Sequence, residues 1–451
     1  MPQHFGWADL KARESNAKTY ARTFDLVLTR AAGVMVYDQE GRDYIDCLAG
    51  AGALALGHNH PFVIDRVGSF LHSGHLQQAL DIATPAKIEF IARLLDALPR
   101  RFAQNARVQL CSPSGSDAVE AAIKLFKIAT GRRAVLAFHG GYHGQTIGAL
   151  SLMGNVGAKQ AVAGLMPEVH FLPFPNAYRC PFGAGGAESD RLSLNYISNL
   201  LDDPESGITK PAAVLVEAVQ GEGGCIPASA QWLKGLRELT QRHDIPLVID
   251  EVQTGFARTG TMFAHEIGDI EPDAIILSKA AGGGFPLALV AYHERYDKWS
   301  PGAHSGTFRG NQIAFVAGAA TMEYLLHHDV AGHAQAVGAV LRTGLERLQS
   351  IYRVIGDVRG RGLMLGVEIV APEAQGHAKA VPANGVLARA IRAECLRHGL
   401  IIETGGRHGA VLRFLPPLTI TVQEVEELLA RFARALKSTH MPQDSASLAC
   451  H

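Results

Sequence analysis

A single lysine stands where an apolar stretch of the sequence changes into glycines. In DAIILSKAAGGG, residues 273–284, Lys279 follows an apolar run and shortly precedes three glycines. Burial disfavours the charged ammonium and lowers its pKa, so a buried lysine without a counter-ion becomes a neutral amine, which is a nucleophile. The alternative is that Lys279 lies just past a strand end with its ammonium in water. Lys279 is therefore a candidate nucleophile whose role depends on its neighbours.

A second candidate site is the segment CSPSGSDAVEAAIKLFKIA, residues 111–129. Small residues follow a predicted strand, and a helix is expected to begin near Asp117, which would cap it together with Glu120. Such a turn leaves backbone N–H groups free, and with the helix dipole and the hydroxyls of Ser114 and Ser116 they would bind a phosphate. The alternative is structural, because strand-to-helix turns favour serine and glycine. No P-loop or GxGxxG pattern is present, so nucleotide binding is unsupported.

A third candidate is the acidic pair that ends the apolar run of PLVIDEVQTGFARTG, residues 246–260. Ligands bind at the carboxyl ends of strands in open α/β sheets, so Asp250 could face a ligand and pair with a protonated ring nitrogen. The alternative is a solvated acid in a turn. Together, the phosphate turn, Tyr142 in FHGGYHG, Asp250 and Lys279 are the parts of a pyridoxal phosphate site: an anion anchor, a stacking aromatic, an aspartate for the ring nitrogen and a lysine that forms a Schiff base.

The elements that must position these residues alternate along the chain. Short apolar runs recur between helical patterns, at 108–110, 134–138, 213–216, 246–249, 274–277 and 287–292. Several runs are apolar on both faces, as strands covered by helices on each side are. The pattern predicts an α/β fold with a mostly parallel central sheet and helices on both faces, in a large domain at residues 71–330.

The two flanks of the chain predict a smaller α+β domain built from both termini, residues 1–70 and 331–437. Residues 24–46 alternate like antiparallel strands with a turn at 38–41, residues 334–352 favour a helix, and residues 362–370 favour a strand. Thr421 and Glu424 form a capping box that opens a further helix. The segment 438–451 lacks periodicity and is predicted to be a mobile tail.

The composition excludes several classes of function. The 451 residues are 47% hydrophobic and carry 42 basic and 43 acidic side chains, so a nucleic-acid or anionic-membrane partner is not expected. The charged start and the absence of any run of about 18 apolar residues predict a cytoplasmic protein. Six scattered cysteines without a CxxC argue against disulfides and structural zinc. His58 with His60, and His139 with His143, are not expected to bind a metal, the second pair because glycines separate it and no acidic residue is nearby.

Six segments resemble those of the class III pyridoxal-phosphate aminotransferases: SGSDAVEAAIK, GGYHGQT, VEAVQGEGG, VIDEVQTGFARTG, LSKAAGGGFPL and GTFRGNQIA. The resemblance extends from about residue 20 to 435, with Ala218 where proline is common. It implies fold type I of the pyridoxal-phosphate enzymes, pyridoxal 5'-phosphate as cofactor, and transfer of an ω-amino group to a 2-oxo acid. It also implies a homodimer or larger homo-oligomer with the active site at the subunit interface.

The resemblance also implies roles for individual residues. Lys279 would be the Schiff-base lysine and the acid/base of proton transfer, and Asp250 would pair with the pyridine nitrogen. The other cofactor contacts would come from Ser114, Gly115 and Ser116 at the phosphate, Tyr142 on the ring face, Gln253 at the ring hydroxyl, Glu217 in the pocket, and Thr307 reaching the phosphate of the neighbouring subunit.

Two more residues would set the choice of substrate. Arg413, in VLRFLPPLTI, resembles the arginine that binds the α-carboxylate of glutamate or 2-oxoglutarate, and Glu222 resembles the gate glutamate that pairs with it; the alternative for Arg413 is a salt bridge between domains. RESNAKTYARTF and YIDCLAGAGALALGHNHP are most similar to members that act on 2,4-diaminobutyrate and 2-oxoglutarate. Ornithine, 4-aminobutyrate, lysine and putrescine remain alternative donors, and a racemase or aminomutase remains an alternative activity. No DNA-reading domain or basic face supports a cofactor-binding regulator.

Overall fold

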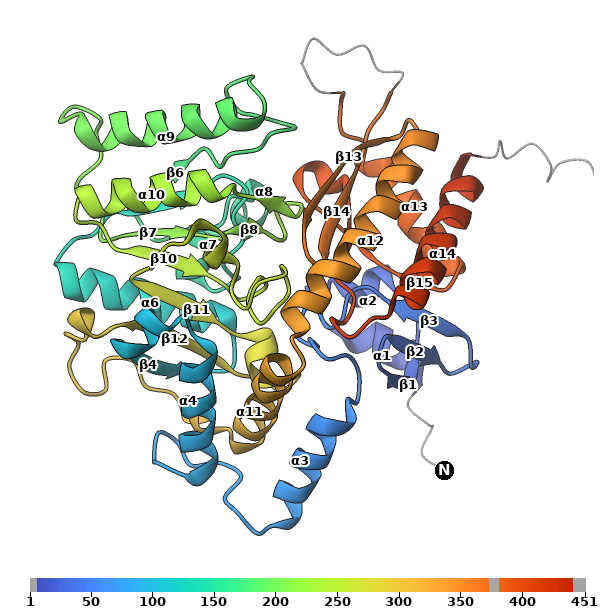
Figure 1. The fold of residues 1–451 in the computed structure, drawn as a ribbon, viewed down its shortest axis with the longest axis horizontal. Helices are drawn as coiled ribbons and strands as arrows, with labels where there is room; N and C mark the ends of the chain where they lie inside the picture. Colours follow the sequence, from blue (N-terminus) through green and yellow to red (C-terminus); the bar gives the residue numbers. More distant parts are fainter. Residues whose placement is uncertain (1–5, 373–380, 441–451) are drawn as a thin grey trace, which may run out of the picture.

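The computed structural model describes residues 6–372 and 381–440, and its main feature is a seven-stranded sheet (Figure 1). The strand order is β4-β12-β11-β10-β7-β5-β6. The strands are β4 (Ala106–Cys111), β5 (Val135–Phe138), β6 (Val169–Leu172), β7 (Ala213–Val216), β10 (Leu247–Asp250), β11 (Ala274–Leu277) and β12 (Ala288–His293). All six predicted runs form strands of this sheet, which is parallel except for β12. β6 was not predicted, because its short sequence VHFL contains a histidine and lies at the sheet edge.

Helices cover both faces of this sheet, which explains why its strands are apolar throughout (Figure 1). On one face Val248 and Ile276 pack with helix α6 (Gly115–Thr130). On the other face Ile249 packs with α10 (Ala230–Arg242), where the fully buried Trp232 lies against Phe138. Helices α4 (Pro85–Ala97), α9 (Gly186–Asp202) and α11 (Gln312–His327) extend this cover. The buried layers leave the strand ends as the place where polar side chains can gather.

One further sheet combines strands from the two ends of the chain, and another comes from the C-terminal part alone. Strands β1 (Leu28–Ala32), β2 (Met35–Asp38) and β3 (Asp43–Asp46) are antiparallel, with the predicted turn after Asp38, and β3 pairs with β15 (Leu400–Ile401) from the other end of the chain. A second sheet has the order β13-β14-β17-β16. Its strands are β13 (Ile355–Arg361), β14 (Met364–Ile369), β16 (Glu403–Gly405) and β17 (Val411–Phe414). The pairing of β3 with β15 therefore brings the two ends of the chain into one sheet, and the division into domains stays a prediction.

Helices α12 (Val330–Ile351), α13 (Gly385–Arg397) and α14 (Val422–His440) complete this part of the structure (Figure 1). The predicted capping box is present, since the Thr421 N–H donates to Glu424 Oε2 (2.8 Å) and the Glu424 N–H donates to Thr421 Oγ1 (3.2 Å). α14 continues to His440, so residues 438–440 are helical and do not belong to a tail. The rest of the predicted tail, 441–451, lies outside the described residues.

The remaining elements are short or peripheral to the main sheet. They are α1 (Trp7–Arg13), α2 (Tyr20–Thr23), α3 (Pro61–His72), α5 (Arg100–Gln104), α7 (Ile147–Ser151), α8 (Val156–Lys159), β8 (Val219–Gln220) and β9 (Ile226–Pro227). Among the helices within 6–372 and 381–440, none has both the length and the apolar character needed to span a bilayer.

Candidate active site

A cavity of about 140 Å³ lies where the parallel strands of the main sheet reach their carboxyl ends. Strands β4, β5, β7, β10 and β11 run in the same direction, so the segments that follow them meet at one sheet edge. The cavity is lined by Ser114, Gly115, Ser116, Tyr142, His143, Gly144, Glu217, Glu222, Asp250, Val252, Gln253, Ser278 and Lys279. Most of the predicted site residues are therefore brought together, although they come from segments far apart in the sequence.

Lys279 lies in the cavity wall, just past the end of β11. Its backbone is left-handed (φ 49°), and it opens the 3-10 helix Lys279–Gly282. A left-handed residue that carries a side chain costs about 1 kcal/mol or more and is found mainly where function requires it. Burial lowers the pKa of Lys279, and Arg413 lowers it further, whereas Glu222 and Asp250 oppose the change. The structure thus favours the buried amine over the interpretation of a solvated lysine.

Asp250 ends β10 with its carboxylate buried and held on both sides. Its Oδ2 lies 2.8 Å from Nδ1 of His143, and its Oδ1 accepts from the Val252 N–H at 3.0 Å. His143 Nε2 is also buried and has no partner among the described residues. The expectation that no acidic residue lies near His143 was wrong, because Asp250 is distant in sequence and only the sheet brings the two together. The motif GGYHG was the one available signal for His143.

The phosphate turn begins helix α6 one turn sooner than predicted. Ser114, rather than Asp117, is the N-cap, and its Oγ accepts from the Ser116 N–H at 3.2 Å. Asp117 Oδ2 instead accepts from the Ser112 N–H at 2.7 Å. Ser112, Ser114 and Asp117 can all act as acceptors in such turns, and the sequence does not decide which one caps. The result places the backbone of Gly115 in the first turn of α6 and at the cavity wall.

Glu120, the predicted capping partner of Asp117, has a different structural role. Its Oε1 accepts hydrogen bonds from the Thr146 hydroxyl (2.6 Å) and from the N–H groups of Gly148 (2.9 Å) and Ala149 (3.1 Å). Because these donors lie at the start of helix α7, Glu120 fixes the segment after Tyr142 against α6. This contact holds the loop that carries Tyr142 and His143 beside the phosphate turn.

Gly144 allows that loop to approach the phosphate turn. Its φ is 125°, and a Cβ at this position would overlap the Ser116 side chain, with 2.6 Å to the Ser116 Cβ. Gly144→Ala is expected to displace Ser116 and to weaken binding of an anionic cofactor about tenfold, since an alanine is strained at this φ and the anion loses a hydroxyl. The dissociation constant of pyridoxal phosphate, measured by titration of the cofactor-free protein, checks this result. Gly131→Ala is a matched control, because Gly131 has a positive φ with open space around it.

Besides His143 Nε2, two further buried polar atoms in the cavity lack a partner within the described part of the chain, namely Glu217 Oε2 and Gln253 Oε1. Gln253 Nε2 is satisfied by the Ala51 carbonyl at 3.1 Å. Burial raises the pKa of Glu217, and the nearby Asp250 and Glu222 add to the effect. Buried polar atoms are rarely left without partners, so these two indicate a bound polar group. Pyridoxal phosphate fits this set of donors and acceptors.

Arg413 lies on β17, and two carboxylates contact the same nitrogen of its buried guanidinium. Nη2 is 2.8 Å from Glu222 Oε1 and 2.7 Å from Glu403 Oε2. Burial alone would lower the pKa of Arg413, but Glu222 and Glu403 outweigh it and raise that pKa. Arg413 thus meets Glu222 as expected, and its field reaches Lys279. The sequence prediction missed Glu403, whose only signal was its position on a short strand preceding β17.

Thr307 does not line the Lys279 cavity. It begins the 3-10 helix Thr307–Gly310 and lines a separate open cavity of about 1020 Å³ with Leu80, Trp299 and Arg309. A contact between Thr307 and a phosphate in the same chain is therefore not part of this structure. The placement is compatible with a contact to a neighbouring subunit, which stays a prediction.

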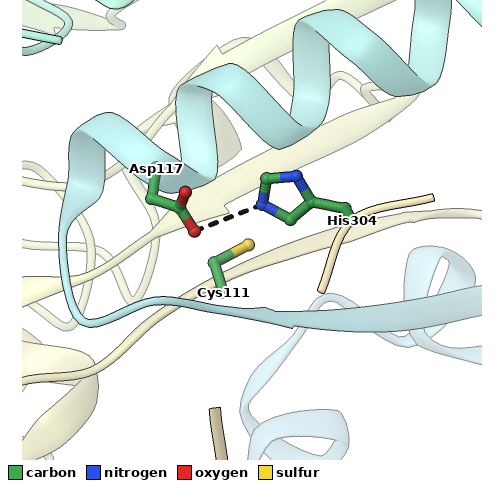
Figure 2. A group of neighbouring side chains, drawn as sticks. All are labelled: Cys111, Asp117 and His304. Carbon is green, nitrogen blue, oxygen red and sulfur yellow. Dashed lines mark hydrogen bonds and ion pairs between the residues drawn. The ribbon is translucent and has the colours of Figure 1, made fainter. Parts of the chain in front are cut away.

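A cluster of possible metal ligands lies beside the phosphate turn, and it contains none of the histidines that the sequence had singled out. Cys111, Asp117 and His304 offer ligand atoms within 4.8 Å of one another (Figure 2). His304 Nε2 is 3.2 Å from Asp117 Oδ2, and burial raises the pKa of the Cys111 thiol. Asp117 therefore links the loop containing His304 to the start of α6. These contacts give the cluster a structural role in holding the turn.

Comparisons with known proteins point to one family. The family described as Aminotransferase class-III matches residues 16–436. A diaminobutyrate–2-oxoglutarate aminotransferase of Rhizobium meliloti is 51% identical over 94% of this chain and 91% of its own length. A protein of the same name from Haemophilus influenzae is 46% identical over 94% and 93%. The structure of an amine transaminase from an uncultivated Pseudomonas species, in its PLP-bound form, has a TM-score of 0.83 at 28% identity and covers 95% of this chain and 98% of its own.

Proposed function

Because the chain belongs to the class III aminotransferases, we propose that it transfers the terminal amino group from 2,4-diaminobutyrate to 2-oxoglutarate, giving aspartate 4-semialdehyde and glutamate. The protein is a pyridoxal-phosphate-dependent enzyme with the fold type I architecture. The observation that carries the proposal is Arg413, a buried cation held between two carboxylates and sensed electrostatically by Lys279. Such a site can bind an anionic acceptor and, with its carboxylates, a cationic donor.

The chain's own residues supply the cofactor site. When bound, pyridoxal phosphate withdraws electrons from the carbon that loses a proton, and this electron withdrawal is supplied by the cofactor and not by the protein. The backbone of Gly115 and the hydroxyls of Ser114 and Ser116 would hold the phosphate at the N-terminus of α6, where the helix dipole favours an anion. Tyr142 and Gln253 would contact the ring, and Glu217 would line the pocket beside it.

Lys279 is the group that holds and moves the proton. Its Nζ has a lowered pKa because it is buried, so a larger fraction of this amine is neutral near pH 7 than for an exposed lysine. A neutral amine both attacks a carbonyl carbon and accepts a proton. Asp250 would hold its carboxylate beside the ring nitrogen, and His143, at 2.8 Å, fixes the direction of that carboxylate. Replacing this charge would remove the field that keeps a ring nitrogen protonated.

Arg413 and Glu222 would alternate between two arrangements during turnover. With Glu222 on Nη2, the charge of the guanidinium is neutralised and a cationic donor is admitted. When Glu222 moves away, Arg413 can bind the 2-oxoglutarate α-carboxylate in a bidentate manner. Glu222 lies in the turn between β8 and β9, where the Gly406 N–H donates to its backbone carbonyl at 2.8 Å, so the movement is a rotation of the Glu222 side chain.

The active unit in this proposal is a homodimer or larger assembly. Several large apolar side chains near Thr307 and in residues 71–88 are more than half exposed in the single chain, namely Leu76, Ile82, Ile88 and Phe308. Exposed apolar groups of this number favour a protein interface, and a second copy of the chain is the proposed partner. The five described cysteines are free and four of them are buried, which supports the reducing cytoplasm as the location.

The test is a donor panel. Pure enzyme with pyridoxal phosphate and 2-oxoglutarate is incubated with 2,4-diaminobutyrate, ornithine, lysine, putrescine and 4-aminobutyrate, and glutamate is measured over time. We expect 2,4-diaminobutyrate to give a kcat/KM at least about tenfold above every other donor, as one added charge contact would provide. A higher value for another donor would reassign the substrate, and racemisation without glutamate would replace transamination by the alternative activity.

A further inference from the structure

The strand pairing holds the Glu403 side chain beside Arg413, whereas Glu222 lies in a turn, where the Gly406 N–H donates to its backbone carbonyl at 2.8 Å. In the antiparallel pair β16–β17, Glu403 lies directly opposite Arg413 in the register. Residues directly opposite in such a pair have neighbouring side chains on one face. The register keeps Arg413 beside Glu403, so Glu403 can move away only by breaking its contact with Arg413. Only 18% of the Glu403 side chain is exposed. Glu222, with 30% exposed, lies instead on a glycine-flanked turn.

The shape of the Arg413 guanidinium requires one of the two glutamates to leave when a substrate carboxylate binds. A carboxylate that binds arginine with two hydrogen bonds uses Nη2 together with either Nε or Nη1. Both glutamates occupy Nη2, while Nε and Nη1 are buried with no partner in residues 6–372 and 381–440. A substrate carboxylate must therefore displace one glutamate from Nη2. Since Glu222 lines the cavity and has the more exposed side chain of the two, Glu222 leaves Nη2 when a substrate carboxylate binds, and Glu403 remains.

The charges at this end of the site sum to an excess of one negative charge. Glu222 and Glu403 carry two negative charges and Arg413 carries one positive charge. The field of Glu403 also reaches the substrate space, because Glu403 raises the pKa of the Tyr142 and Tyr20 hydroxyls, in each case after burial and, for Tyr142, after Glu222. Lys279 and Glu222 line the cavity, whereas Glu403 is outside its lining and contacts Arg413 from β16, so Glu403 lies beyond Arg413 as seen from the reacting amine.

From these observations we infer that Glu403 is the specificity-determining residue for the donor: its carboxylate, kept in place by Arg413, receives the second ammonium of a diamino acid. This inference rests on the proposed function. A donor that carries an ammonium on the carbon far from the reacting amine finds the carboxylate of Glu403 there, while Glu222 stays on Arg413. A donor that ends in a carboxylate alone meets Glu403 as an unfavourable like charge.

Two donors of equal chain length test this inference, since 4-aminobutyrate is 2,4-diaminobutyrate without the second ammonium. Glu403→Gln keeps the size of the side chain and an oxygen for Arg413 but removes the charge. In the holoenzyme, we expect kcat/KM for 2,4-diaminobutyrate to fall about 10- to 100-fold, mainly through KM, as the loss of a charged hydrogen bond predicts. The value for 4-aminobutyrate is expected to stay constant or rise, and the KM for 2-oxoglutarate to stay constant or fall.

A purely structural role for Glu403 gives a different pattern. If Glu403 only supports Arg413, Glu403→Gln will raise the KM for 2-oxoglutarate and reduce both donors equally, which would overturn the inference. Glu403→Asp, which keeps the charge, is expected to retain the preference for 2,4-diaminobutyrate and serves if the glutamine variant does not fold. Glu294→Gln is the matched control, because Glu294 forms an exposed ion pair with Arg107. This variant should change neither the kcat/KM values of the two donors nor the KM for 2-oxoglutarate.

Binding without turnover gives an independent measurement. In the Lys279→Ala protein loaded with pyridoxal phosphate, calorimetry should show that adding Glu403→Gln weakens 2,4-diaminobutyrate about tenfold or more and leaves 4-aminobutyrate unchanged. An equal loss for both ligands contradicts the inference. If the unmodified enzyme makes no glutamate from 2,4-diaminobutyrate, the proposed function fails instead, and the two failures are thus distinguishable.

Discussion

Replacing Lys279 with alanine is expected to reduce the rate of glutamate formation by at least about 10³-fold, since both a nucleophile and a general acid/base are removed. No other lysine lines the cavity among the described residues, so no second amine can take over. The measurement is glutamate production from 2,4-diaminobutyrate and 2-oxoglutarate at saturating pyridoxal phosphate. The visible absorption of covalently held cofactor should disappear in parallel.

The folded protein should survive this change. Burial lowers the pKa of the Lys279 amine, so its charged form is disfavoured in the folded protein and its removal leaves a small cavity rather than an isolated counter-charge. Lys210→Ala is the matched control, because Lys210 forms an exposed pair with Asp244 and should keep full activity. A Lys279→Ala enzyme that turns over at more than a few per cent of the normal rate would show that the proton is moved by another group.

Asp250→Asn is expected to lower kcat by about 10²- to 10⁴-fold with a smaller change in KM, because the amide has the size of the carboxylate but no charge. The Asp250 carboxylate is buried and paired with His143 at 2.8 Å. Its charge can therefore act on a ring nitrogen without competition from bulk water. The loss should appear in the reaction of the donor alone, followed in single turnover, as well as in steady state.

Two comparisons make this prediction specific to charge. Asp244→Asn removes a carboxylate from the protein surface, where Asp244 pairs with Arg132, and should leave kcat unchanged. Cofactor affinity measured for Asp250→Asn separates weak binding from slow chemistry, and saturating pyridoxal phosphate should not restore the rate. Full recovery at high cofactor concentration would mean that Asp250 serves to bind the ring rather than to assist the reaction.

The sequence predicted the framework of the site better than its electrostatic details. Strand runs that are apolar on both faces have few alternative structures, so β10 and β11 were correctly placed and with them Asp250 and Lys279. The pairs His143–Asp250 and Glu403–Arg413 join segments through tertiary contacts and strand register, and one sequence does not specify either. The predicted N-cap of α6 was wrong for a local reason, since Ser114 and Asp117 are both suitable acceptors close together in the sequence.

At Lys279 the left-handed backbone lowers the stability of the fold, whereas the lysine side chain is needed for activity. Glycine would adopt this conformation without strain, so selection for stability alone would remove the lysine. The left-handed conformation of Lys279 persists because the neighbouring strands and the hydrogen bond from the Ser278 hydroxyl to the Leu287 carbonyl (2.8 Å) hold the backbone in place. A selection for stability alone, without a requirement for activity, is therefore expected to replace Lys279 with glycine and to yield an inactive protein.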